Sequence, residues 1–333
     1  MNGLGRGTRT CVCYHLRYGS KQRDHVERHD SSESRMTFTE FMRRFPTNDA
    51  CLEYLKERFY PAGTECPNPK CRKASKFHRI KGRSAYSCQY CGHHVYPTAG
   101  TIFHKSTTSL QLWFWAIYLM SSTRCGLAAK HLEREIGVSY KTAHRMFKQI
   151  RTLLDDGGSL SGRVEIDETY MGGRRKGSPW GGRPGPNDST KPPVLAMVER
   201  KGKVKARVVP NVRRATLLPE IQRYVDPSSI VYTDELKSYD LLGQHYSQHW
   251  RIPHSLGIFI QGHVYTNTAE SFFSLVKGGI WGTYRGVSTR YLQNYLDEYA
   301  WRWNHKYDRR SMFQTILDQV EKDGPQLVAR PLG

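Results

Sequence analysis

Apolar residues recur every three or four positions through much of the first half of the chain, which is the spacing of a buried helix face. This pattern predicts two short amphipathic helices within 37–60 and three further helices at 110–120, 126–137 and 140–151. A serine precedes the first and the last of these three, where its hydroxyl can accept a hydrogen bond from a free N–H of the first turn. We therefore expect residues 97–154 to be all-helical.

The second half of the chain opens with alternation, the pattern of a strand with one buried face. In 163–170 it places Val164 and Ile166 on one face and Glu165 and Asp167 on the other. The later elements that we expect are strands at 194–200, 204–209 and 230–234, a helix at 215–224 and a helix that carries Glu270. Strands interleaved with helices in this way indicate an α/β domain.

Several stretches lack apolar periodicity. Residues 1–36 are polar and charged, and we expect a disordered tail there. Because Met36 opens a more ordinary sequence, we hypothesise that 1–35 are not translated, which mass spectrometry of the native N-terminus would decide. The composition of 155–162 is that of a linker. The glycine, proline and arginine residues of 174–191 predict either a mobile basic loop that grips DNA or a disordered insertion, and 321–333 is expected to be a C-terminal tail.

The charge balance is strongly basic. The chain of 333 residues has 51 Lys plus Arg against 30 Asp plus Glu, a net charge of +21. This surplus favours a polyanionic partner, of which nucleic acid is the first candidate, with a negative membrane surface or simple solubility as the alternatives. The longest apolar run, 110–120, is too short to span a bilayer, and the first residues lack the apolar core of a signal peptide. We expect a cytoplasmic, nucleoid-associated protein without a membrane partner.

Four of the eight cysteines have the spacing of a metal site. Cys66 and Cys71 form one pair, and Cys88 and Cys91 form a second pair after sixteen intervening residues. Two such pairs on a short hairpin can bring four thiolates to one tetrahedral Zn²⁺. We therefore predict a structural zinc ribbon within 37–96 and a reducing compartment.

The helices after the ribbon have the order of a helix-turn-helix. The segment 126–137 ends at a glycine, and a serine then precedes the helix at 140–151. The residues near the start of this second helix that we expect to contact DNA are Tyr140, Lys141, His144 and Arg145. An ordinary helical hairpin with a solvated basic face is the alternative, but the neighbouring ribbon and the net charge favour DNA.

Three acidic residues stand where the predicted elements can bring them together. Asp167 lies on the first strand of the α/β domain, Asp234 ends the fourth, and Glu270 lies on a later helix, on one face with Lys277. Such a cluster can hold two Mg²⁺ or Mn²⁺ ions that activate one oxygen of a phosphodiester exchange and stabilise the other. By itself, the Glu270–Lys277 pair is equally typical of a surface ion pair. Four neighbouring acids are expected to be surface charges: Glu165, Glu168, Glu235 and Asp240.

At these residues the sequence resembles a known family. It is similar to bacterial insertion-sequence transposases of the DDE type that have an N-terminal zinc ribbon and an ISXO-like catalytic domain. The stretches that carry the resemblance are the two cysteine pairs and the segments 96–104, 164–173, 231–234, 263–277 and 295–305. They are several independent motifs spread over about residues 37–315.

The resemblance implies an RNase H-like fold for 163–320, a mixed sheet flanked by helices. It further implies that Asp167, Asp234 and Glu270 hold two catalytic Mg²⁺ or Mn²⁺ ions, with Asn267 or His263 as the alternative third ligand, and that Lys277 contacts DNA. The expected activity is cleavage at the ends of the element followed by transfer of the freed 3′-hydroxyl to target DNA, without a covalent enzyme intermediate. Element ends, target DNA and further copies of the chain are the expected partners.

Three other functions account for part of the pattern. A zinc-ribbon and helix-turn-helix regulator would explain the N-terminal half and the charge, but it has no need for three converging acids. An RNase H-like nuclease would share the acids without the DNA-reading modules. A catalytically inactive relative of a transposase would keep every motif.

Overall fold

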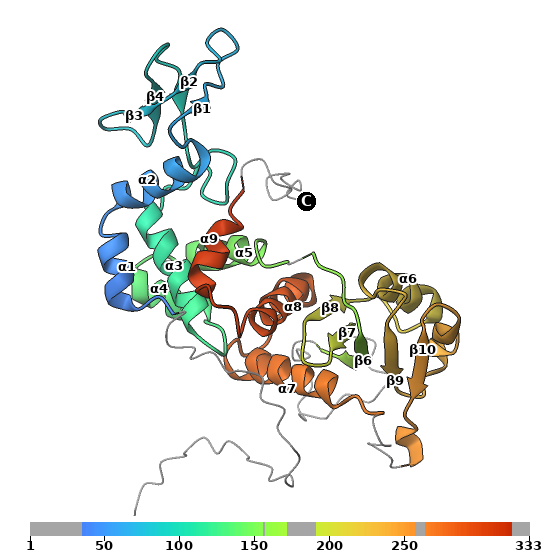
Figure 1. Cartoon of the computed structure of the whole chain (residues 1–333). Coiled ribbons are helices and arrows are strands. Elements are labelled where there is room, and N and C mark those ends of the chain that lie inside the picture. The colour runs from blue at the N-terminus through green and yellow to red at the C-terminus, as the bar shows by residue number, and fades with distance from the viewer. Residues whose placement is uncertain (1–34, 156, 172–190, 257–263, 322–333) are drawn as a thin grey trace, which may run out of the picture.

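The computed structural model describes residues 35–155, 157–171, 191–256 and 264–321 (Figure 1). The expected N-terminal tail, basic loop and C-terminal tail lie wholly or almost wholly outside these ranges, and so does the alternative ligand His263. No helix in the described part of the chain is both long and apolar enough to cross a membrane.

The N-terminal part is helical, as the apolar spacing predicts. Its helices are α1 (Phe38–Arg44), α2 (Asn48–Phe59), α3 (Leu110–Ser122), α4 (Ala129–Ile136) and α5 (Tyr140–Arg151). Both predicted serine caps are confirmed: Ser109 accepts from the N–H of Leu112, and Ser139 accepts from the N–H of Thr142. Helix α4 starts three residues later than predicted and ends at Gly137, whose φ of 69° is the left-handed conformation that glycine adopts without strain.

The ribbon between α2 and α3 consists of short antiparallel strands. They are β1 (Thr64–Glu65), β2 (Ala74–Ser75), β3 (Phe77–Arg79), β4 (Tyr86–Cys88) and β5 (His94–Val95). Strands β1 and β2 pair with each other, and β3, β4 and β5 form a second small sheet. The ribbon projects from the helical part at the top of Figure 1.

The second part of the molecule contains a five-stranded mixed sheet. Its strands are β6 (Arg163–Tyr170), β7 (Pro193–Glu199), β8 (Val204–Val208), β9 (Ile230–Thr233) and β10 (Gln248–Arg251), in the order β10-β9-β6-β7-β8. Strands β6, β7 and β8 are antiparallel neighbours, whereas β9 is parallel to β6 and β10 is parallel to β9. The predicted RNase H-like α/β fold is confirmed. Strand β10 was missed, because it is an edge strand whose side chains are mostly exposed and show no apolar alternation.

Helices cover both faces of this sheet. The helices from this half of the chain are α6 (Arg214–Tyr224), α7 (Asn267–Gly282), α8 (Thr289–Asn304) and α9 (Met312–Asp318), with short 3-10 turns at Lys237–Tyr239, Leu242–Gln244 and His254–Leu256. Val164 and Ile166 pack under α6 in one buried cluster, while Val194 and Ala196 pack under α7 and α8 in another. The strand alternation predicted for β6 therefore holds, with its apolar face toward α6.

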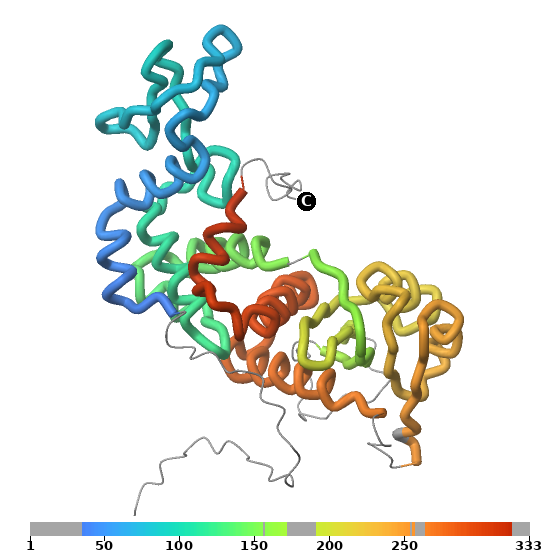
Figure 2. Tube along the Cα trace, viewed as in Figure 1, coloured from blue at the N-terminus to red at the C-terminus, as the bar shows by residue number. Residues whose placement is uncertain are grey.

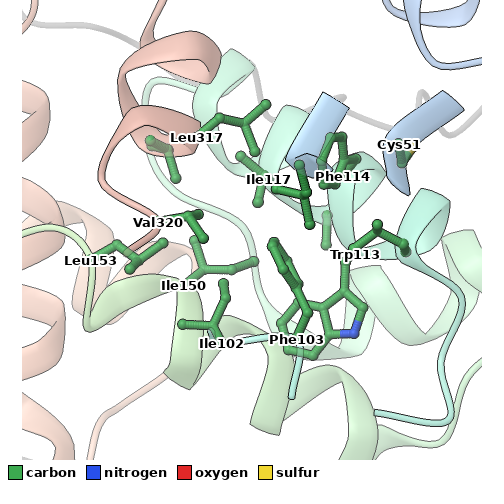
Figure 3. Packing of buried hydrophobic residues seen from close by; sticks show 14 of the residues in the cluster. Cys51, Ile102, Phe103, Trp113, Phe114, Ile117, Ile150, Leu153, Leu317 and Val320 are labelled. Carbon is green, nitrogen blue, oxygen red and sulfur yellow. The ribbon is translucent and has the colours of Figure 1, made fainter. Parts of the chain in front are cut away.

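Two predicted boundaries differ from the structure. Helix α9 was assigned to the catalytic domain 163–320, but Phe313 is buried in the N-terminal core. Leu317 is buried in the same core (Figure 3). The reason is that the apolar residues of α9 fall on one helical face, which fits against the aromatic cluster around Phe114. The linker 155–162 also ends inside the second part of the molecule, because Leu160 is buried and pairs with Val225.

The chain thus leaves the N-terminal helices once and returns to them. In Figure 2 the trace passes from the ribbon through the green helices into the sheet, then comes back through α7 and α8 to α9. Helix α8 lies between the two parts, since Tyr299 is buried in the core between the sheet and α7, and Trp301 is buried in the N-terminal core. The position of the N-terminal helices relative to the sheet is therefore fixed by packing.

Candidate active site

The four predicted zinc ligands converge in the ribbon. Cys66, Cys71, Cys88 and Cys91 offer sulfur atoms that all lie within 4.8 Å of one another, and Cys66 Sγ is 3.7 Å from Cys91 Sγ. A tetrahedral Zn²⁺ with bonds of about 2.3 Å requires sulfur atoms roughly 3.8 Å apart. The donor set and its spacing therefore fit zinc.

The surroundings of Cys88 favour a thiolate. Burial alone would raise the pKa of this thiol, but Ser75 Oγ lies 3.1 Å from its sulfur, and the backbone N–H groups of Tyr90 and Cys91 also stabilise the charge. Together these hydrogen bonds lower its pKa to about 6. Gly92 has a φ of 70°, the left-handed conformation that allows the second cysteine pair to turn tightly.

A second candidate site is a cavity of about 600 Å³ between the end of β6 and one face of α7. Asp167 reaches it from β6, and Glu270 and Lys277 reach it from α7. The remaining lining residues are Glu168, Thr169, Phe273, Ser274, Gly278 and Trp281. The structure therefore brings three of the four predicted catalytic residues to one cavity.

Asp234 follows β9 directly and lies beside this cavity without lining it. Its Oδ1 accepts the N–H of Leu236 at 2.9 Å, which fixes the turn after the strand. Its negative charge nevertheless contributes to raising the pKa of both Asp167 and Glu168. Within the described ranges, the four cysteines are the only group of three or more His, Cys, Asp or Glu residues whose ligand atoms all lie within 4.8 Å of one another, so at least two of the three carboxylates are further apart than this.

The carboxylates of this site repel one another. Burial is the first cause that raises the pKa of Asp167 to about 7, and the negative charges of Asp234 and Glu270 add to it, whereas Lys277 acts in the opposite direction. Such a surplus of negative charge is relieved by bound cations, and carboxylate oxygens are the ligands that Mg²⁺ and Mn²⁺ prefer. The residues present therefore fit divalent ions.

Two acids that were predicted to be surface charges are part of this region. Glu168 lines the cavity and accepts a hydrogen bond from the phenol of Tyr239, and burial is the main reason that its pKa is raised to about 7. Glu165 is completely buried beneath the start of α7. For Glu165 a signal was available, because it alternates with Asp167 and must face the same way. For Glu168 no local pattern indicates Tyr239 as a partner.

The remaining predicted acids and the alternative ligand lie at the surface. Glu235 and Asp240 are exposed, as predicted, and interact with Ser255 and Arg251 respectively. Asn267 is also exposed and does not line the cavity. It is the first residue of α7, one turn before Glu270, but only Glu270 is among the residues that line the cavity.

The four residues predicted to contact DNA lie on the first half of α5, but they differ in exposure. Tyr140, Lys141 and Arg145 are exposed. His144 is half-buried, and its ring lies 5.4 Å from the ring of Tyr291 on α8. Burial, followed by the charge of Arg151, lowers the pKa of His144. Of the four predicted contact residues, Lys141 and Arg145 therefore supply the exposed positive charge.

Family models match both parts of the chain. A model described as an ISXO2-like transposase domain matches residues 159–304, and a model described as a transposase zinc-ribbon domain matches residues 46–94. The second match ends beyond Cys91, so it contains all four cysteines of the ribbon. The first contains Asp167, Asp234 and Glu270.

Individual relatives point the same way. An "Uncharacterized transposase-like protein" of Haemophilus influenzae is 39% identical over 122 residues, which are 37% of this chain and 96% of the relative. An "Uncharacterized protein in transposable element ISH50" of Halobacterium salinarum is 29% identical over 257 residues, which are 72% of this chain and 85% of the relative. Among solved structures, the chain in the "Crystal structure of the Mos1 Strand Transfer Complex" is 14% identical, and the match covers 62% of the present chain and 74% of the Mos1 chain. The TM-score of this match is 0.27, which is too low to support any inference.

Proposed function

The chain belongs to the family of ISXO2-like transposases with a zinc ribbon, and from this premise we propose that it moves an insertion sequence. It would cleave DNA at the ends of the element and transfer the freed 3′-hydroxyl to target DNA. The observation that carries this proposal is the convergence of Asp167, Glu270 and Lys277 on one cavity, with Asp234 beside it.

The residues around the cavity suit a reaction at a phosphodiester. Asp167, Asp234 and Glu270 would hold two divalent ions, Mg²⁺ or Mn²⁺. Such ions, when bound, would supply Lewis-acid catalysis to the attacking and departing oxygens. Lys277 lies on the same face of α7 as Glu270, so its ammonium group would bind a non-bridging phosphate oxygen and hold the strand across the cavity.

The N-terminal part would recognise the element ends. Lys141 and Arg145 on α5 would contact DNA near the groove, and the zinc-bound ribbon would add a second contact surface. We further propose that two or more copies assemble on DNA, since two element ends must be held together, and that the protein works on the nucleoid.

A joining assay tests this function. Purified, zinc-loaded protein is incubated with Mg²⁺, labelled DNA carrying the element's ends and a target plasmid. We expect cleaved ends and joined products with the wild type, and loss of both with Asp234→Ala. The matched control is Glu235→Gln, because Glu235 is the next residue, is exposed, and its carboxylate accepts hydrogen bonds from the backbone N–H and the hydroxyl of Ser255. This variant should react like the wild type.

The other results separate the alternatives. Unchanged joining by Asp234→Ala would refute the proposed site. Specific binding of the ends with no cleavage in any divalent metal would favour a DNA-binding regulator or an inactive relative. Cleavage without preference for the element ends would favour a nuclease.

A further inference from the structure

We propose that Glu165 and Arg200 form a clamp that holds the first turn of α7 on β6 and thereby sets the spacing of Asp167 and Glu270. Glu165 is a positioning residue in this proposal and has no contact with the substrate. The inference rests on the proposed function, because it concerns the metal-holding carboxylates.

Glu165 takes the place of a capping residue for α7. One oxygen, Oε2, accepts the N–H of Thr268 at 2.7 Å and the N–H of Ala269 at 3.1 Å. The other, Oε1, accepts the hydroxyl of Thr268 at 3.0 Å. Thr266, the residue at the N-cap position, makes no side-chain capping hydrogen bond. The first turn of α7 is therefore capped by a carboxylate from a strand more than a hundred residues earlier.

Arg200 holds the other side of this carboxylate. Its Nε lies 2.7 Å from Glu165 Oε1, and its Nη2 donates to the carbonyl oxygen of Tyr265 at 2.7 Å. The guanidinium carbon is 3.9 Å from the ring centre of Tyr232 and 3.7 Å from that of Tyr265. Arg200 thus fixes both the carboxylate and the backbone that leads into α7.

These contacts lie directly beside the predicted metal ligands. Glu165 is two residues before Asp167 on the same face of β6, about 7 Å along the strand. Ala269, whose N–H it accepts, immediately precedes Glu270. A single buried side chain therefore connects the strand that carries one predicted ligand with the helix turn that carries the other. A shift or tilt of α7 on β6 would change the separation of the two carboxylates.

A neutral side chain could not replace this arrangement fully. The fully buried carboxylate is stable because Arg200 and three hydrogen bonds compensate for its lost hydration. Glutamine at this position keeps one acceptor oxygen for the helix but turns an amide NH₂ group toward another donor. Leucine keeps the volume and accepts nothing. We therefore expect glutamine to weaken the clamp in part and leucine to abolish it.

The test measures Mn²⁺ binding by calorimetry on the zinc-loaded full chain, and amide exchange of the first turn of α7. The variants are Glu165→Gln and the double variant Glu165→Leu/Arg200→Met, which leaves no unpaired buried charge. The control is Glu298→Gln, because Glu298 is an equally buried carboxylate that pairs with Arg151 and Arg302 outside the cavity.

We expect the double variant to bind Mn²⁺ about 10- to 100-fold more weakly, which is the usual effect of losing a residue that orients a ligand. Glu165→Gln should lie between it and the wild type. Amide exchange at Thr268 and Ala269 should accelerate in the same order, while Glu298→Gln changes neither measurement even where its melting temperature falls. An unchanged Mn²⁺ affinity in a folded double variant would refute the clamp alone. Absence of Mn²⁺ binding by the wild type would overturn the clamp and the proposed function together.

Discussion

Replacement of Glu298 tests whether a buried charge cluster joins the two parts of the molecule. This carboxylate on α8 is fully buried. It lies 2.6 Å from Arg151 Nε at the end of α5 and 2.7 Å from Arg302 Nη2, and it accepts the phenol of Tyr284 at 3.1 Å. Arg302 also donates to the carbonyl oxygen of Met120 at the end of α3. One carboxylate therefore connects α8 to the N-terminal helices.

The expected magnitude follows from the two arginines. Glu298→Ala would leave two guanidinium groups buried without their counter-charge, and removal of one partner from a buried pair costs about 3–5 kcal/mol. For a unit of this size, each kcal/mol lowers the melting temperature by about 2–4 °C, so we expect a decrease of roughly 6–20 °C. Lys130→Gln is the control, because Lys130 pairs with Glu133 at the surface and such pairs contribute at most about 1 kcal/mol.

The same carboxylate predicts a dependence of stability on pH. Burial alone would raise the pKa of Glu298, but the charges of Arg151 and Arg302 outweigh it and lower the pKa below the usual value. A lowered folded-state pKa gives stability that is complete above the unfolded value of about 4.3 and is lost as the pH falls through the folded value. The difference in stability between the wild type and Glu298→Gln should therefore shrink below about pH 4.

Calorimetric melting of the zinc-loaded protein at pH 7 and at lower pH measures both effects. A melting temperature of Glu298→Ala within 2 °C of the wild type, on the scale of about 2–4 °C per kcal/mol, would show that the cluster does not hold the two parts together.

Three further predictions follow from single contacts. Alanine at Gly279 would overlap the phenol of Tyr299 and should destabilise the protein by about 1–3 kcal/mol in thermal melting, whereas alanine at Gly278 meets no atom within 4 Å and should be neutral; equal stability of the two variants would contradict the packing. Cys88→Ser should remove zinc from the purified protein, measured by metal analysis, and weaken binding of the element ends; full zinc content would exclude Cys88 as a ligand. Arg145→Ala should reduce the slope of log binding constant against log salt concentration by about one, as measured in gel-shift titrations. An unchanged slope would show that Arg145 does not contact the DNA.

Local patterns were sufficient to predict much of this molecule. The cysteine spacing identified the ribbon, because four thiolates on a short hairpin have few alternative uses. The serine caps and the alternation of β6 depend on neighbouring residues, and all three appear in the structure as predicted. The role of Asp167, Asp234 and Glu270 as metal ligands came from the family resemblance, because hydrophobic periodicity alone does not assign a function to acidic residues.

The features that were missed depend on partners far away in the sequence. The alternation of β6 places Glu165 on the same face as Asp167, but its partners, Arg200 and the N–H groups at the start of α7, cannot be assigned from spacing. Glu298 and Arg302 have the spacing of an ordinary surface pair on a helix, and only Arg151, from a different part of the chain, makes them a buried cluster. Helix α9 was placed with its sequence neighbours, although its apolar face fits the other core.

The central claim is that Glu270, and not Asn267, is the third metal ligand beside Asp167 and Asp234. The most direct measurement is the single-turnover rate of cleavage at an element end in Mg²⁺ for Glu270→Gln and Asn267→Ala, at DNA concentrations that saturate each variant. Because loss of a metal ligand removes several kcal/mol of transition-state stabilisation, we expect Glu270→Gln to be slower by at least about a hundredfold and Asn267→Ala to cleave at nearly the wild-type rate. Wild-type cleavage by Glu270→Gln together with an inactive Asn267→Ala would contradict the claim.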